Sequence, residues 1–155
     1  MTTAADRIDR AGIRRATRGD LLDVFRIEKE SFPQPWPFSA FEEHVDDPGF
    51  LVAESATGVA GYVVADTIPN HGPPIGHVKD LAVHPDARGR GLGRSLLSRA
   101  LGVLGAAGSR SVKLEVRRSN DVAISLYRGF DFEHLRTLPG YYSDGEDAFV
   151  MVAHL

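Results

Sequence analysis

Residues 83–94, with the sequence VHPDARGRGLGR, constrain the fold of this chain more than any other segment. An apolar run typical of a strand ends at Val83, and an amphipathic pattern typical of a helix begins at about Gly91. The chain therefore passes from strand to helix through a bend that contains Gly89, Gly91 and Gly93. Because glycine carries no side chain, the backbone N–H groups at the positive end of this helix stay uncovered, and a phosphate can approach them.

Three arginines, Arg88, Arg90 and Arg94, flank the bend and add charge suited to a polyphosphate. The bend lacks the Lys-Ser/Thr ending of an ATP-binding P-loop, and its glycine spacing differs from that of dinucleotide-binding folds. These residues alone are consistent with any pyrophosphate ligand, or with a glycine-rich turn whose arginines are simply solvated.

Hydrophobic periodicity places strands and helices along the rest of the chain. The predicted strands are 13–16, 50–54, 59–66, 75–83, 112–116, 132–138 and 148–153. The predicted helices are 18–30, a second one from Ser39, a third from about 91 to the 105–108 region, and 120–128. An antiparallel hairpin followed by strand, helix, strand and helix predicts a mixed α/β sheet with helices on its faces.

Local patterns add detail to three of these elements. Ser39 and Glu42 have the spacing of a capping box, which predicts that Ser39 begins the second helix. The apolar residues of strand 75–83 do not alternate cleanly, which indicates a bulge or burial on both faces. Residues 112–117 alternate strictly between apolar and charged, so this strand has one apolar face and one polar face.

Composition limits the class of protein and its partners. With 155 residues, 43% hydrophobic and 25% charged, the chain has the profile of one globular domain, predicted over 12–155, with a flexible arm over 1–11. The net charge of -3 gives no sign of a nucleic-acid or membrane partner, and a cytoplasmic location is expected. Because the chain has no cysteine, and its histidines form no ligand motif, neither a cysteine nucleophile nor a metal site is predicted.

Four segments together resemble the GNAT acetyltransferase superfamily. The first is the bend, with the spacing R-x-x-G-x-G after the apolar LAV of residues 81–83. The others are LEVRRSN at 114–120, AISLY at 123–127 and YYSDGEDA at 141–148. The segments are most similar to protein N-terminal acetyltransferases of the RimI type, which act on a ribosomal-protein alanine, and to their archaeal relatives. The similarity runs from about residue 13 to residue 153.

The resemblance implies a largely antiparallel sheet of about six or seven strands, with a central parallel pair that splays apart and helices on both faces. It implies acetyl-CoA as cosubstrate, no metal, and direct attack of an amine on the bound thioester in a ternary complex. The residues expected to contact the cofactor are Leu81, Ala82, Val83, Arg88, Gly89, Arg90, Gly91, Leu92, Gly93, Arg94, Asn120 and Tyr127. Asn120 also stands where it would cap the helix that follows it.

Three residues are expected to carry the chemistry. By resemblance, Glu115 matches the family's proton acceptor, Tyr127 its general acid beside the CoA sulfur, and His77 a substrate-site histidine of archaeal relatives. Spacing alone instead favours a cross-strand ion pair for Glu115, a core position for Tyr127 and a structural role for His77. Glu115 and Tyr127 argue against a module that binds acyl-CoA without catalysis.

Two loops are expected to form the acceptor site, which by resemblance takes a protein N-terminus. Phe32, Pro33 and Trp36 would form one wall, and Tyr141 and Tyr142 the other. The first three are nearly as consistent with an aromatic cluster that anchors the first helix. The expected reaction is acetylation of a protein N-terminal amine, with a ribosomal protein among the candidate targets, and the alternative acceptor is a lysine side chain or a small amine. Oligomeric state does not follow from the sequence.

Two positions depart from the family's pattern. Asp131 stands where the family usually has glycine just before the phenylalanine, so a left-handed turn of modest cost is expected there. Gln34 follows Pro33 where eukaryotic-like relatives have glutamate. Because glutamine cannot accept a proton, no general base is expected from this loop.

Overall fold

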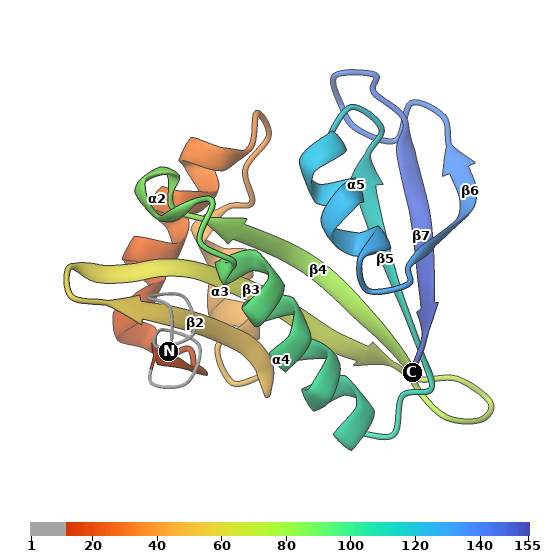
Figure 1. Cartoon of the computed structure of the whole chain (residues 1–155), viewed down its shortest axis with the longest axis horizontal. Helices are drawn as coiled ribbons and strands as arrows, with labels where there is room; N and C mark the ends of the chain where they lie inside the picture. Colours follow the sequence, from red (N-terminus) through yellow and green to blue (C-terminus); the bar gives the residue numbers. More distant parts are fainter. Residues whose placement is uncertain (1–11) are drawn as a thin grey trace.

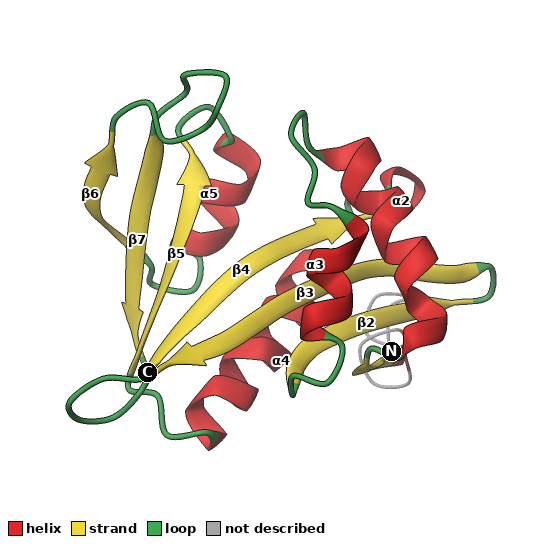
Figure 2. Ribbon diagram, turned by 180° about the vertical axis from the view of Figure 1, so that it is seen from behind, coloured by secondary structure: helices red, strands yellow, loops and turns green. Residues whose placement is uncertain are grey.

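The computed structural model describes residues 12–155, which form a seven-stranded sheet with flanking helices (Figures 1 and 2). The strands are β1 (Ile13–Arg15), β2 (Gly49–Ser55), β3 (Gly58–Ile68), β4 (Ile75–Val83), β5 (Ser111–Arg117), β6 (Glu133–Leu138) and β7 (Ala148–His154). The helices are η1 (Arg18–Asp20), α2 (Leu21–Ser31), α3 (Phe38–His44), η2 (Pro85–Ala87), α4 (Leu92–Ala106) and α5 (Asp121–Arg128), of which η1 and η2 are 3-10 turns. The arm predicted over 1–11 lies outside the described residues.

The sheet has the order β1-β2-β3-β4-β5-β7-β6. Only β4 and β5 run parallel, and every other neighbouring pair is antiparallel. This arrangement confirms the predicted mixed sheet with a central parallel pair. Within residues 12–155, no helix is long and apolar enough to cross a membrane.

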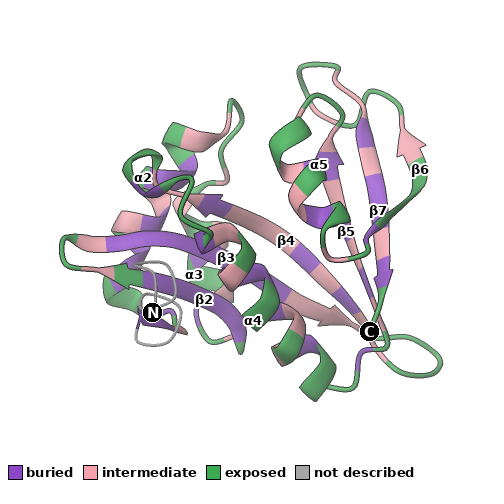
Figure 3. Ribbon diagram, viewed as in Figure 1, coloured by how far each residue is buried: buried purple, intermediate pink, exposed green. Residues whose placement is uncertain are grey.

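The sheet separates two hydrophobic cores, because successive side chains of β2 and β3 point to opposite faces. Leu51 and Val63 belong to the core that packs against α4 and α5, whereas Phe50 and Val64 belong to the core that packs against α2 and α3. Figure 3 shows β2 and β3 buried along most of their length, as expected for strands covered on both sides. The prediction of helices on both faces is therefore confirmed.

β4 and β5 part soon after they meet. They are paired only from Gly76–Val112 to Val78–Leu114, and beyond this point the two strands diverge (Figure 1). At the same place the register of β4 against β3 shifts, so that Lys79 is an extra residue, and the bulge predicted for this strand is confirmed. The divergence opens one edge of each strand to a ligand.

Several predicted boundaries differ from the structure by a single residue, and three elements show further differences. The helix expected from Ser39 begins at Phe38, after Pro37 at the N-cap, and no side chain caps it. The fixed φ of Pro37 suits the start of a helix and leaves Ser39 inside the first turn, so the predicted capping box is wrong. The helix expected over 18–30 opens with the 3-10 turn η1, in which the Asp20 carboxylate accepts a hydrogen bond from the Thr17 N–H at 2.8 Å. β3 continues to Ile68, two residues beyond the predicted end of this strand at residue 66.

Asp131 adopts the left-handed conformation expected from its place in the sequence. Its φ is 65°, and among residues 12–155 it is the only non-glycine residue with a positive φ. The turn lets the Phe132 N–H donate to the Tyr127 carbonyl at 3.2 Å. Phe132 is buried, and its ring packs against the Tyr127 ring at 5.9 Å between centroids. The turn therefore fixes the end of α5 on the core.

Replacing Asp131 with glycine is expected to stabilise the protein. Glycine reaches this φ without a steric penalty, although its more flexible unfolded state offsets part of the gain. The free energy of unfolding, measured by urea denaturation, should rise by about 0.5–1 kcal/mol. Asp131→Asn is the matched control and should change little, because asparagine tolerates the same conformation. A loss of stability in Asp131→Gly would contradict this account.

Candidate active site

A cavity of about 150 Å³ lies where β4 and β5 part. Its lining comes from α2 and the loop after it, β4, β5, α5 and the loop before β7. Predicted residues of all three roles line it: Phe32, Trp36, Leu81, Glu115, Asn120, Tyr127 and Tyr142. Residues separated by almost the whole sequence are thus brought to one site.

Glu115 projects from the polar face of β5 and is held by two side chains. Its Oε2 lies 2.7 Å from His77 Nε2, and its Oε1 accepts a hydrogen bond from Lys113 Nζ at 3.2 Å. The hydrogen bond with His77 is the main reason that the pKa of Glu115 falls to about 2, while burial opposes the shift and Lys113 assists it. His77 is not among the residues that line the cavity. Glu115 therefore forms an ion pair, as spacing alone favours, and it also lines the cavity.

Tyr127 is both a core residue and a cavity residue. It is buried, and its ring packs on Phe132. Burial raises the pKa of its hydroxyl, and the nearby Asp80 and Tyr142 charges raise it further. The hydroxyl therefore stays protonated at working pH, so a proton donor is present in the lining of the cavity.

Asn120 caps α5 and lines the cavity at the same time. Its side-chain Oδ1 accepts a hydrogen bond from the Ala123 N–H at 3.2 Å, which confirms the predicted N-cap. The side-chain amide nitrogen forms no hydrogen bond with any residue in the described part of the chain, so it can donate to a ligand. Leu81 differs, because its N–H already donates to Asp80 Oδ1 at 3.0 Å.

The glycine bend leads into α4 with an open backbone. Gly89 and Gly91 have φ values of 79° and 80°, and Gly91 is the N-cap of α4. No side chain caps this helix, and a Cβ on Gly89 would meet nothing within 4 Å. The first N–H groups of α4 therefore have neither a side-chain partner nor a covering side chain at the bend, as an anion site requires.

Two of the three arginines at the bend have structural partners. Arg88 donates from Nε to the Val83 carbonyl at 3.0 Å and from Nη2 to Ser31 Oγ at 3.3 Å. The Arg94 guanidinium lies 5.6 Å from the centre of the Phe130 ring. Both arginines are nevertheless exposed to solvent, so these contacts do not decide between a phosphate site and a turn with solvated arginines. Arg90 forms no hydrogen bond or ion pair with any residue of the described segment.

The first expected acceptor wall is anchored to α2. The Trp36 N–H donates to Glu28 Oε2 at 2.8 Å, and the Trp36 ring packs 5.3 Å from the Phe41 ring. Trp36 thus belongs to the aromatic cluster and lines the cavity as well. Pro33 does not line the cavity.

The second expected wall places one tyrosine at the cavity and one outside it. Tyr142 lines the cavity, whereas Tyr141 is 54% exposed and is not part of the lining. The two rings meet edge to face, 5.1 Å apart. Burial is the main reason that the pKa of Tyr142 rises to about 12.

Sequence reasoning missed a group of polar residues at the cavity. Tyr62 donates from its hydroxyl to Glu28 Oε1 at 2.5 Å, and the same hydroxyl lies 3.4 Å from Asp80 Oδ2. Burial raises the pKa of Asp80 well above its ordinary range, and Glu28 raises it further. One signal was available: Glu28 follows Val24 by four residues, which puts a carboxylate on the apolar stripe of α2.

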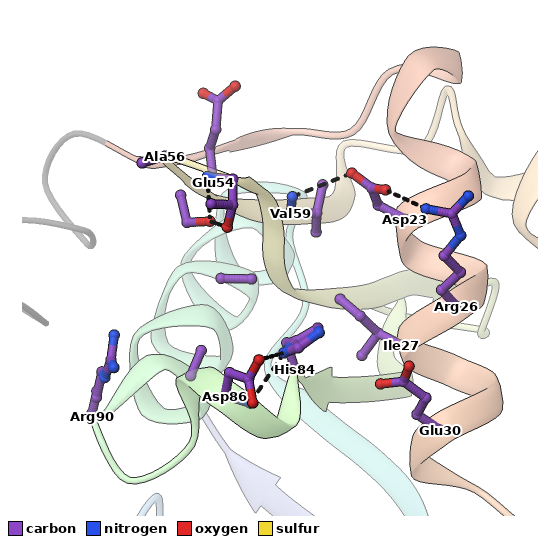
Figure 4. Close-up of a pocket in the computed structure, with 15 residues that line it drawn as sticks. Asp23, Arg26, Ile27, Glu30, Glu54, Ala56, Val59, His84, Asp86 and Arg90 are labelled. Atoms are coloured by element: carbon purple, nitrogen blue, oxygen red, sulfur yellow. Dashed lines mark hydrogen bonds and ion pairs between the residues drawn. The ribbon is translucent and has the colours of Figure 1, made fainter.

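A larger groove of about 870 Å³ lies between α2, the β2–β3 turn and the segment after β4 (Figure 4). Asp23 pairs with Arg26 in this groove, and His84 Nδ1 lies 3.8 Å from Asp86 Oδ2, whereas Arg90 has no such partner among the described residues. Of the predicted site residues, only Arg90 lines it. The chemistry expected from the sequence therefore belongs to the smaller cavity.

One group of three potential metal ligands occurs among the described residues. His44, Asp47 and Asp66 have ligand atoms within 4.8 Å of one another, and His44 Nδ1 already pairs with Asp47 Oδ2 at 2.6 Å. None of the three lines the cavity that contains Glu115.

Residues 21–132 match the acetyltransferase (GNAT) family, so the chain belongs to this family. It is an N-acetyltransferase that uses acetyl-CoA as cosubstrate.

Among proteins of known identity, the chain is 37% identical over 154 residues to the N-alpha-acetyltransferase of Sulfolobus acidocaldarius, with 92% of each chain covered. Among solved structures, Ard1 from Thermoplasma volcanium matches with a TM-score of 0.84 and 28% identity, covering 92% of this chain and 96% of that one. The ribosomal-protein-S18-alanine N-acetyltransferase from Escherichia coli matches with a TM-score of 0.79 and 27% identity, covering 92% of each. The predicted similarity to archaeal and RimI-type enzymes is confirmed.

The low pKa of Glu115 should make stability depend on pH in acid. In the folded state Glu115 stays ionised down to about pH 2, whereas an unfolded glutamate takes up a proton near 4.5, so the unfolded state gains protons as pH falls through this window. Unfolding free energy should therefore drop more steeply in the wild type than in Glu115→Gln, by at most about 1.4 kcal/mol per pH unit. Urea denaturation at several pH values between 2 and 5 measures both slopes, and parallel slopes would show that Glu115 is not held as described.

Proposed function

We propose that this chain acetylates the N-terminal α-amino group of proteins. The observation that supports the proposal most directly is that Glu115 and Tyr127 line one cavity at the parting of β4 and β5. An amine there would have a proton acceptor and a proton donor on either side of the reacting bond. The name of the Sulfolobus acidocaldarius relative, N-alpha-acetyltransferase, supports the same acceptor.

The donor would lie along the open edge of β4, with its diphosphate at the glycine bend. Backbone N–H groups from residues 89–94 would bind the diphosphate, with Arg90 adding charge. The extended pantetheine arm would pair with the backbone of residues 81–83, as an added strand pairs with a sheet edge. The Leu81 N–H would exchange its bond to Asp80 for one to the cofactor, and the Asn120 amide would donate to the same arm.

The reaction would proceed by direct transfer. The amine nitrogen forms a bond to the thioester carbonyl carbon, and the carbon–sulfur bond breaks. The proton lost by the amine goes to Glu115, directly or through a water, and His77 orients this carboxylate. Tyr127 gives its proton to the departing CoA thiolate, so the products are an acetylated amine and free CoA.

The chemistry of the nucleophile favours a protein N-terminus over lysine. The ordinary pKa of an α-amine is about 8 and that of lysine about 10.4, so the neutral α-amine costs about 3 kcal/mol less at neutral pH. Glu115, with a pKa of about 2, is a weak base and suits the less basic amine. Because the Escherichia coli neighbour is named for a ribosomal-protein alanine, a ribosomal protein N-terminus is our first candidate target.

The acceptor is tested by incubating the protein with acetyl-CoA and a library of peptides, then locating the added acetyl group by tandem mass spectrometry. We expect the mass shift on N-terminal α-amines. Libraries with blocked N-termini and free lysines serve as the control. Modification restricted to lysine side chains, or to polyamines added in parallel, would reject the proposal.

Tyr127→Phe should lower kcat about a hundredfold, because a positioned general acid contributes at least that much. Acetyl-CoA affinity, measured by calorimetry, should stay near the wild-type value, since the phenyl ring still fills the same space. Ser125→Ala, an exposed change on the same helix, is the control for the fold of α5. A kcat in Tyr127→Phe equal to that of the wild type would remove Tyr127 from its assigned role.

A further inference from the structure

Arg117, at the end of β5, joins side chains from both expected acceptor walls. Its Nη1 donates to Asp144 Oδ2 and to Glu146 Oε1, each at 2.9 Å. Its Nη2 donates to Gln34 Oε1 at 3.2 Å, and the guanidinium carbon lies 4.0 Å from the centre of the Tyr142 ring. The side chain is 13% exposed, so these contacts occupy most of its surface.

The late loop, which is residues 139–147 between β6 and β7, is fixed to the end of β5 by further bonds. The other oxygen of Glu146, Oε2, accepts a hydrogen bond from the Ser119 N–H at 3.0 Å. Within the loop, the Tyr142 N–H donates to the Glu146 carbonyl at 3.1 Å. This wall therefore has several attachments to β5 and the turn after it.

The first loop, residues 32–37, has a single hydrogen bond to β5 and the late loop among the described residues. Its backbone is held to α2, where the Trp36 N–H donates to Glu28. Across the described residues, the bond between Gln34 and Arg117 is the one hydrogen bond that links residues 32–37 to β5 or to the late loop. This contact is therefore the direct hydrogen-bonded link between the two walls.

We propose that Arg117 is a positioning residue that holds the two acceptor walls at a fixed distance and thereby sets the affinity for the peptide acceptor. The inference rests on the proposed function, because it places the peptide between these walls. Arg117 lines the cavity two residues from Glu115, but it does not take part in proton transfer. Its effect reaches the substrate through Gln34 on one side and Tyr142 on the other.

Only arginine can make this set of contacts. Its planar fork donates in several fixed directions while one face stacks on an aromatic ring, whereas lysine offers a single charged point on a flexible stem. Lysine at position 117 would keep a charge near Asp144 and Glu146 but lose the stacking and the bond to Gln34. Arg117→Lys therefore tests the contacts with Gln34 and Tyr142 rather than the presence of a positive charge.

The first measurement compares steady-state kinetics of Gln34→Ala with the wild type, using one peptide acetylated by the wild type. We expect the KM for the peptide to rise about tenfold, because a hydrogen bond to a charged group is lost and the wall is released. The kcat should change far less, because the Glu115 and Tyr127 contacts are untouched. The calorimetric Kd for CoA should not change.

Two variants separate this role from a general loss of structure. Gln34→Glu keeps an oxygen acceptor for Arg117 and should restore a KM close to the wild-type value. Arg118→Gln removes a neighbouring arginine whose side chain is 65% exposed and pairs with Asp147 at 3.5 Å, and it should leave the KM unchanged. Adding Gln34→Ala to Arg117→Lys should raise the KM little further, because both changes break the same bond.

The outcomes distinguish the inference from the proposed function. A wild-type KM in Gln34→Ala, or multiplicative effects in the double variant, would overturn the inference alone. If the wild-type protein acetylates no N-terminus, the proposed function fails and the inference fails with it. Should Arg117→Lys not fold, the comparison of Gln34→Ala with Gln34→Glu decides the question, since both changes lie on a surface loop.

Discussion

The parting of β4 and β5 is the constraint on which the rest of the structure depends. Parallel strands that diverge leave N–H and C=O groups without sheet partners, and such groups must find others when water is excluded. The extra residue Lys79 turns β4 away just where its pairing with β5 ends. Because α4 follows β4 through the glycine bend, the positive end of that helix stands at the end of the open edge. An extended pantetheine arm that ends in a diphosphate matches both features.

β5 is the second element on which the site depends, because its successive side chains face the core and the cavity in turn. Leu114 and Val116 are buried in the core with α4 and α5, while Glu115 and Arg117 face the cavity. A shift of one residue in its pairing with β7 would exchange these sets and bury the charges. The register of β5 therefore keeps both Glu115 and Arg117 at the cavity.

Periodicity was enough to predict the order of the strands and helices, whereas the expectation that Glu115 and Tyr127 lie at one site came from the family resemblance. Neither could predict partners that lie far away in the sequence. Arg88 bonds to Ser31, 57 residues away, and its expected contact with phosphate gave no hint of this bond. Glu28 accepts a hydrogen bond from a tyrosine 34 residues away, and only its place on an apolar stripe hinted at a buried carboxylate. Side-chain partnerships of this kind follow from the packing of the sheet.

The two hydrophobic cores on opposite faces of the sheet have a consequence for diversification. The first acceptor wall extends from α2 and α3 on one face, whereas the donor bend leads into α4 on the other. The bond between Arg88 and Ser31 links the two regions, and changes away from it, in groups that share no contacts, combine independently. New amine preferences can therefore arise by drift and selection on one side of the molecule, while the thioester-holding half is inherited unaltered.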